Sequence, residues 1–130
     1  MKVELLNGAN LAFIGDAYYE LYIREYCLKK GITNQKGLHK ECVKYVSAHG
    51  HFQIFEKMKE NNFLTEEEMA VYKRGRNHNY HSNRKNLILS EYVASSGFES
   101  LIGYLYLKDN KERLEEIMQF SIKVIEGNNE

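Results

Sequence analysis

The chain has 130 residues, of which 18 are basic and 18 acidic, so its zero formal net charge indicates no particular partner. This length suits one domain with a substantial core, and we expect a single domain over residues 1–130. No apolar run is long enough to cross a membrane, and no basic and apolar signal peptide opens the sequence. We therefore expect a cytoplasmic protein with no membrane role.

Hydrophobic residues recur at helical spacing along most of the chain, and no segment alternates as a strand does. In chain order, this spacing predicts helices over residues 10–29, 38–49, 52–60, 66–75, 90–107 and 111–126. A turn is expected at 34–37 and a polar loop at 77–86. Thr65 and Glu68 have the spacing of a capping box before the fourth helix. The absence of proline also suits long helices. The sequence thus predicts an all-α fold.

The two cysteines, Cys27 and Cys42, both fall in predicted helices. Their spacing is not that of a metal site, and a cytoplasmic location disfavours a disulfide. We expect both to be reduced, packed thiols.

Two strongly apolar segments each contain an acid near their start. Asp16 lies in LAFIGDAYYELYI (residues 11–23), and Glu99 lies in SSGFESLIGYLYL (residues 95–107). If these helices pack together, two carboxylates share one poorly solvated place, which is unfavourable unless a cation joins them. Oxygen ligands favour a hard cation such as Mg²⁺ or Mn²⁺. The alternative is that each acid pairs with a lysine or arginine, or faces solvent.

A basic segment follows the fourth predicted helix. From Met69 to Ser90 the sequence has no acid but five arginines and lysines, together with several asparagines. Such a segment suits contacts with the phosphates and 2′-hydroxyls of RNA, although a merely solvated loop would look the same. His78 and His81 also lie there, and their surroundings do not indicate a metal site.

Five motifs, in order, resemble the ribonuclease III family and in particular its mini-ribonuclease III branch, which consists of the catalytic domain without the appended double-stranded-RNA-binding domain. These motifs are NGANLAFIGDA, LHK, VSA, LTEEEMAVYKRGRN and SSGFESLIGYLYL. The resemblance implies an all-α helical bundle that forms a two-fold homodimer and cleaves double-stranded RNA with Mg²⁺, for which Mn²⁺ can substitute. It further implies maturation of the base-paired ends of the 23S ribosomal RNA precursor.

By motif position, Asp16 and Glu99 match the family's catalytic, metal-binding acids. Glu20 and Ser96 are then expected to support these ligands by hydrogen bonding. The RNA-binding residues are expected in the basic segment: Lys73, Arg74, Arg76, Asn77, Lys85 and Asn86.

Three positions depart from the larger family's motifs. Ala9, Ala12 and Ser96 stand where acids are usual, so the number of metal ions per site is open and RNA phosphates could complete the coordination. Specificity for one RNA would then need help, for example from a large-subunit ribosomal protein.

The reduced number of acids leaves a second hypothesis open. It is a catalytically silent helical dimer that binds structured RNA as a ribosome assembly factor. A third and weaker hypothesis is a protein-binding helical module with no nucleic-acid role.

Overall fold

The computed structural model describes residues 1–77 and 89–127, and every regular element within these ranges is helical. The prediction of an all-α fold is therefore confirmed. The elements, in order, are η1 (Val3–Leu5), α1 (Gly8–Lys29), α2 (Gln35–Val46), α3 (Ala48–Glu60), α4 (Glu66–Arg76), α5 (Leu89–Leu107) and α6 (Lys111–Gly127).

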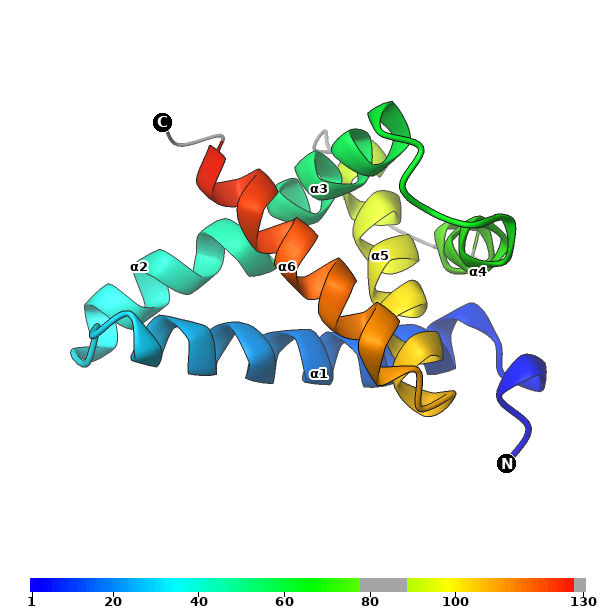
Figure 1. The fold of residues 1–130 in the computed structure, drawn as a ribbon, viewed down its shortest axis with the longest axis horizontal. Coiled ribbons are helices and arrows are strands. Elements are labelled where there is room, and N and C mark those ends of the chain that lie inside the picture. Colours follow the sequence, from blue (N-terminus) through cyan, green and yellow to red (C-terminus); the bar gives the residue numbers. More distant parts are fainter. Residues whose placement is uncertain (78–88, 128–130) are drawn as a thin grey trace.

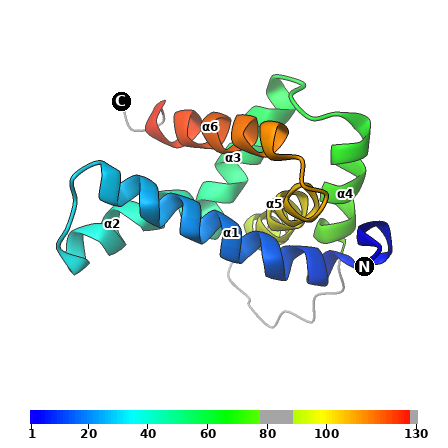
Figure 2. The same ribbon diagram turned by 60° about the horizontal axis from the view of Figure 1, so that its bottom comes forward.

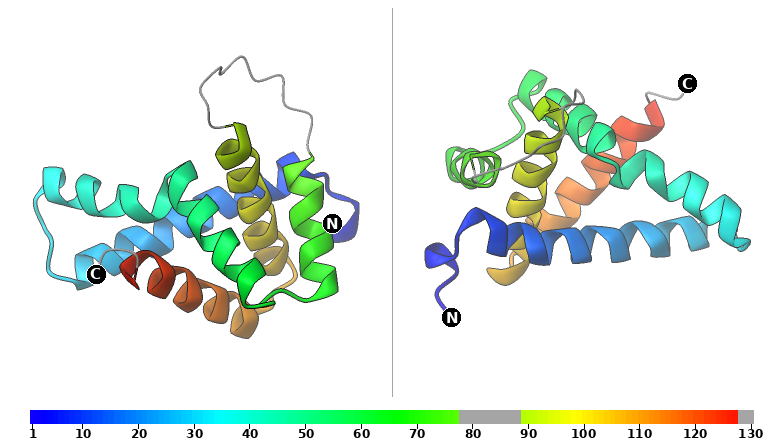
Figure 3. Two further views of the ribbon diagram at one scale, coloured as in Figure 1. Left: turned by 90° about the horizontal axis from the view of Figure 1, so that it is seen from above. Right: turned by 180° about the vertical axis from the view of Figure 1, so that it is seen from behind.

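Helix α5 forms the centre of the molecule. It contacts α1, α3, α4 and α6, and Figure 2 looks nearly along its axis with these helices around it. Because neighbours cover several of its sides, α5 is apolar around most of its circumference. Helix α1 runs past one side of α5 and continues beyond it, where α2 returns alongside (Figure 1). Seen from above, α1 and α2 extend to one side as a helical hairpin (Figure 3).

The starts of α2 and α3 differ most from the predicted ones, because a polar side chain caps each of these helices earlier than expected. The expected turn at 34–37 is the beginning of α2, since the Asn34 side chain accepts a hydrogen bond from Gly37 N at 2.6 Å. Helix α2 then ends at Val46 rather than at residue 49, because Ser47 has extended backbone angles and caps α3. Helix α3 begins at Ala48, four residues before the predicted start.

The predicted capping box of α4 is present. Thr65 accepts a hydrogen bond from Glu68 N at 3.1 Å, and the Glu68 carboxylate accepts one from Thr65 N at 3.0 Å. Three glutamates in the first turn and three basic residues in the last complement the helix dipole. Basic side chains are thereby collected at the C-terminal end of α4.

The core lies where α5 meets its neighbours and is rich in aromatic side chains. Tyr19, Tyr45, Tyr72 and Phe98 are almost fully buried, and the Tyr19 hydroxyl donates to the Tyr45 carbonyl at 3.0 Å, so this buried polar group is satisfied. Among the described residues, no helix is both long and apolar enough to cross a lipid bilayer.

Candidate active site

Two glycines allow α1 and α5 to cross with their backbones in contact. A Cβ built on Gly15 would lie 1.8 Å from the carbonyl oxygen of Glu99, and one built on Gly103 would lie 1.9 Å from that of Leu11. Any other residue at either position would force the helices apart. Gly15 immediately precedes Asp16, and Gly103 lies one turn after Glu99. The crossing therefore places the two acids side by side.

The carboxyl groups of Asp16 and Glu99 lie close together at this crossing. Asp16 is exposed, whereas Glu99 is half-buried. Burial raises the pKa of Glu99 to about 9, and hydrogen bonding to Asp16 and the negative charges of Asp16 and Glu20 add to the shift. The ion-free chain therefore holds a proton on Glu99 at neutral pH.

The two residues expected to support these ligands occupy different surroundings. Glu20 lies one turn after Asp16 on α1 and forms an ion pair with Arg24, with 3.0 Å between Oε2 and Nε. Its charge nevertheless reaches Glu99, whose pKa it raises. Ser96 is half-buried on α5, three residues before Glu99. The supporting roles of Glu20 and Ser96 stay predictions.

The donor set at the crossing suits a hard divalent cation. Both groups are carboxyls, and a cation between them would relieve the repulsion that raises the pKa of Glu99. Among residues 1–77 and 89–127, no group of three or more histidines, cysteines and acids has the arrangement of a complete metal site. Asp16 and Glu99 could thus hold a cation only if water or substrate oxygens supplied the remaining ligands.

The basic end of α4 packs beside this crossing. A Cβ built on Gly75 would lie 2.1 Å from Ser100 Oγ, and one built on Gly8 would lie 2.8 Å from Gly75 Cα. These close approaches hold the last turn of α4 against both α1 and α5. The cationic side chains of that turn are consequently near the two helices that carry Asp16 and Glu99.

The predicted RNA-binding residues of α4 are not equally available. Lys73 is exposed, whereas Arg74 and Arg76 are half-buried. Arg74 Nη1 donates to the Glu4 carbonyl at 3.1 Å, and Arg76 Nε donates to Asn77 Oδ1 at 3.1 Å. Two further predicted residues, Lys85 and Asn86, lie outside the described residues, as do His78 and His81.

Sequence reasoning did not single out His51, which is buried behind the crossing. Its Nδ1 lies 2.7 Å from Ser95 Oγ on α5, and its ring packs on those of Tyr19 and Phe98, with centroids 5.1 and 4.7 Å away. Burial lowers the pKa of His51 to about 3, so the ring is neutral. Hydrophobic periodicity could not reveal that His51 is buried here. The glycines close to the two acids, Gly15 and Gly103, were a usable sequence signal for the crossing of α1 and α5.

The model of the ribonuclease III domain matches residues 9–110, which contain both acids and both glycines of the crossing. The chain belongs to the ribonuclease III family. Within it, the chain is 46% identical to the mini-ribonuclease 3 of Streptococcus pneumoniae over 127 residues, covering 98% of this chain and 99% of that protein. It is also 46% identical to the mini-ribonuclease 3 of Enterococcus faecalis, covering 96% and 95% of the two chains. These matches place it in the mini-ribonuclease 3 branch.

A solved structure has the same fold. A crystal structure of a Fusobacterium nucleatum protein superposes with a TM-score of 0.79 at 35% identity, covering 90% of this chain and 93% of that one. As a member of its family, the chain is a ribonuclease III-type endoribonuclease. Such enzymes generally depend on divalent metal ions.

Proposed function

We propose that this mini-ribonuclease 3 cleaves double-stranded RNA with Mg²⁺ held by Asp16 and Glu99, and that Mn²⁺ can substitute. The observation that carries the proposal is the meeting of these two carboxyl groups at the glycine crossing of α1 and α5. Oxygen donors and an unbalanced negative charge favour a hard divalent cation over a soft one.

The two acids at the crossing, Asp16 and Glu99, differ in their exposure to solvent. Glu99, half-buried on α5, and Asp16, exposed on α1, would hold the cation together, and Asp16 is the more accessible of the two. When bound, such a cation would neutralise negative charge on a phosphate oxygen, and it would make a water molecule easier to deprotonate. Glu99 must release its proton for this role, so cation binding and proton release are coupled.

The basic residues at the C-terminal end of α4 would bind the phosphates of the RNA backbone. Lys73 is exposed on the last turn of α4, close to α1 and α5, and Arg76 and Asn77 follow. Contacts of this kind read the shape of an RNA duplex rather than its sequence, and they weaken as salt is added. We expect Lys73→Glu to reduce duplex affinity, whereas the matched variant Lys123→Glu, at an exposed position on α6, leaves it unchanged. Equal losses in both variants would contradict the proposed position of the duplex.

The active enzyme is proposed to be a two-fold homodimer in which an exposed apolar stripe on α1 contacts a second copy. Phe13 and Leu21 lie on the same face of α1, and their exposed fractions are 80% and 67%. Such side chains are unfavourable in water and mark contact surfaces. Because Phe13 is exposed, Phe13→Ser should preserve the fold. It should lower the mass measured by light scattering to that of one chain, and an unchanged mass would exclude this face.

The proposed substrate in the cytoplasm is the base-paired stalk at the ends of the 23S ribosomal RNA precursor, with a large-subunit ribosomal protein as a candidate specificity factor. The relatives named mini-ribonuclease 3 support the nuclease class, and the particular RNA is inferred from the resemblance to that branch. Incubation of the purified chain with a 23S precursor, alone and bound to large-subunit ribosomal proteins, followed by mapping of the product ends, tests this step. Cleavage confined to the stalk under either condition supports the proposal, whereas cleavage elsewhere or none under both contradicts it.

A second candidate is the catalytically silent RNA-binding dimer. It is favoured by one observation: the described residues contain no group of three or more metal-ligating side chains. A long RNA duplex incubated with the chain in Mg²⁺, and then in excess chelator, separates the two functions. Cutting that requires the metal supports the enzyme, and retained binding without cutting supports the silent dimer.

A further inference from the structure

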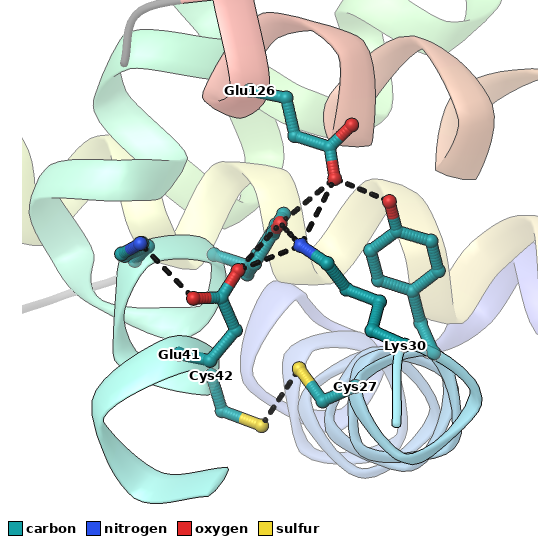
Figure 4. Close-up of polar contacts among 8 residues, drawn as sticks. Cys27, Lys30, Glu41, Cys42 and Glu126 are labelled. Carbon is teal, nitrogen blue, oxygen red and sulfur yellow. Dashed lines mark hydrogen bonds and ion pairs between the residues drawn. The ribbon is translucent and has the colours of Figure 1, made fainter. Parts of the chain in front are cut away.

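The two cysteines lie face to face between α1 and α2. Cys27 Sγ and Cys42 Sγ are 3.3 Å apart, and both thiols are free. Figure 4 shows the two side chains pointing toward each other from their two helices. Cys27 is fully buried, and Cys42 is 9% exposed.

An adjacent polar cluster fixes this approach. Lys30 Nζ lies 2.8 Å from Glu41 Oε2 and 3.4 Å from Glu126 Oε2, so it joins α2 and α6 to the end of α1. The hydroxyl of Tyr45 also donates to Glu126, at 3.0 Å. The cluster lies beside the thiols in Figure 4. Side-chain contacts among α1, α2 and α6 therefore stabilise the arrangement of the helices that carry the two thiols.

A groove gives a small reagent access to one of the two thiols. It has a volume of about 370 Å³, lies between α1 and α2, and is lined by Cys42 together with Leu28, Leu38 and Val43. Cys27 does not line it. Burial, followed by the contact with Cys42, raises the pKa of Cys27 to about 12. Because the groove reaches Cys42 and the pKa of Cys27 is raised, Cys42 is the thiol expected to react first.

We propose that Cys27 and Cys42 form a reversible disulfide site that a peroxide oxidises, tying the end of α1 to α2. The Cys42 thiolate attacks one oxygen of hydrogen peroxide, the O–O bond breaks, and hydroxide leaves to become water, which produces a sulfenic acid. The Cys27 sulfur then attacks the Cys42 sulfur. The S–O bond breaks, an S–S bond forms, and a second water carries away the Cys27 proton. Two thiols are oxidised, and one peroxide is reduced to two waters.

The structural change required is small. A disulfide has an S–S length of about 2.05 Å, so the sulfur atoms, now 3.3 Å apart, need to close by about 1.3 Å. The bond would close a ring over residues 27–42 and stabilise the α1–α2 hairpin mainly by restricting the unfolded chain. For a ring of this size in a domain of this length, we expect the melting temperature to rise by about 10 °C.

The test oxidises the full-length chain with hydrogen peroxide. We expect the two titratable thiols to disappear together, the mass to fall by two hydrogen atoms, and dithiothreitol to restore both. The melting temperature should rise on oxidation and return on reduction. Cys27→Ala should instead stop at a sulfenic acid on Cys42 that a dimedone probe labels, and Cys42→Ser should be oxidised much more slowly.

Three results would overturn the proposal. They are native thiols that survive peroxide while the urea-unfolded chain is oxidised, disulfides that form only between chains, and oxidation without a rise in melting temperature. A second measurement requires no substitution, because phenylarsine oxide binds tightly only where two thiols are adjacent. Stoichiometric arsenical binding by the native chain that a monothiol does not reverse supports the site, whereas its absence contradicts the pairing.

Discussion

Two of the places where charged side chains of distant segments meet differ in how their charges are balanced. In the cluster of Lys30, Glu41 and Glu126, Lys30 faces both glutamates. Lys44 also pairs with Glu41, at 3.0 Å, so two positive charges balance two negative ones. At the crossing of α1 and α5, Asp16 and Glu99 meet, and among the described residues no basic group lowers the raised pKa of Glu99. The charges of the cluster are balanced by its own side chains. Those of the crossing are not, and our proposal of a cation at Asp16 and Glu99 rests on this difference.

The largest expected effect comes from removing one acid of the crossing. Asp16→Asn should lower the rate of duplex cleavage by about a thousandfold, equivalent to about 4 kcal/mol, because the cation loses a charged ligand. Asp16 is exposed, so the fold and RNA binding should persist. Asp109→Asn is the matched control, since Asp109 is exposed and its backbone φ of 59° suits asparagine equally. A parental cleavage rate in Asp16→Asn would refute the assigned role.

The next effect tests what brings the acids together. Gly15→Ala places a methyl group 1.8 Å from the Glu99 carbonyl oxygen, so α1 and α5 must separate. We expect a loss of about 3 kcal/mol in the free energy of unfolding, measured with urea. Gly127→Ala is the control, because nothing lies within 4 Å of the added atom. If both variants unfolded at the parental urea concentration, the close crossing would be wrong.

His51 gives a further test, because it is buried behind the crossing and no described residue supplies it with a counter-charge. Its folded pKa of about 3 is below the value of 6.5 for an unperturbed histidine, so the unfolded chain binds a proton first as the pH falls. Its contribution to stability is therefore complete above pH 6.5 and is lost between pH 6.5 and 3, at up to about 1.4 kcal/mol per pH unit.

This pH dependence has a matched pair of variants. His51→Phe removes the titrating group, so the urea stability of the parent relative to that of His51→Phe should fall as the pH drops from 6.5 to 4. Glu99 has an opposite slope, but it is common to both proteins and cancels in this difference. The parent and His39→Phe, changed at an exposed position, should differ by an amount that does not vary with pH. A constant difference between the parent and His51→Phe would assign the effect to other residues.

The smallest expected effects are changes in the free energy of unfolding, and they have opposite signs in the Lys30 cluster and at the crossing of α1 and α5. Glu41 forms ion pairs with both Lys30 and Lys44, so Glu41→Gln should lower the free energy of unfolding by about 1 kcal/mol at neutral pH. The hydrogen bond and charge of Lys30 hold the pKa of Glu41 down at about 2. This stabilisation is present above the unfolded pKa and is lost as the pH falls toward 2.

Glu99→Gln should do the reverse. The raised pKa of Glu99, about 9, means that its contribution is complete below the unfolded value of about 4.5 and is lost as the pH rises to 9. In chelator at pH 7, Glu99→Gln should therefore raise the free energy of unfolding by about 1 kcal/mol or more. Losses of the same sign in both variants would contradict the distinction between the two places.

Periodicity was sufficient for the helices that bury one face, a continuous apolar run indicated α5, and the Thr65 capping box marked the start of α4. It failed between residues 46 and 52, where apolar spacing continues through Ser47 although the backbone does not. For the site, the sequence could indicate which acids lie in apolar helices. It could not give the angle of the crossing, which depends on contacts between Gly15 and Gly103 and residues of the opposite helix.

The polar cluster was not predictable for a related reason. Lys30 and Glu126 are 96 residues apart, and neither has a local pattern that marks it as a partner of the other. His51 likewise looks like any polar residue at the start of a helix. Pairings of this kind arise only once the helices have been packed, so they were visible in the structure alone.

The central claim is that Asp16 and Glu99 hold the same cation, and a double-mutant cycle on duplex cleavage tests it most directly. The rates of Asp16→Asn, Glu99→Gln and the double variant are compared with the parental rate in saturating Mg²⁺. Two ligands of one ion act as a unit, so the double variant should be no slower than the slower single variant, within a few-fold. Losses that multiply, as they do for independent residues, would contradict a shared ion at the crossing.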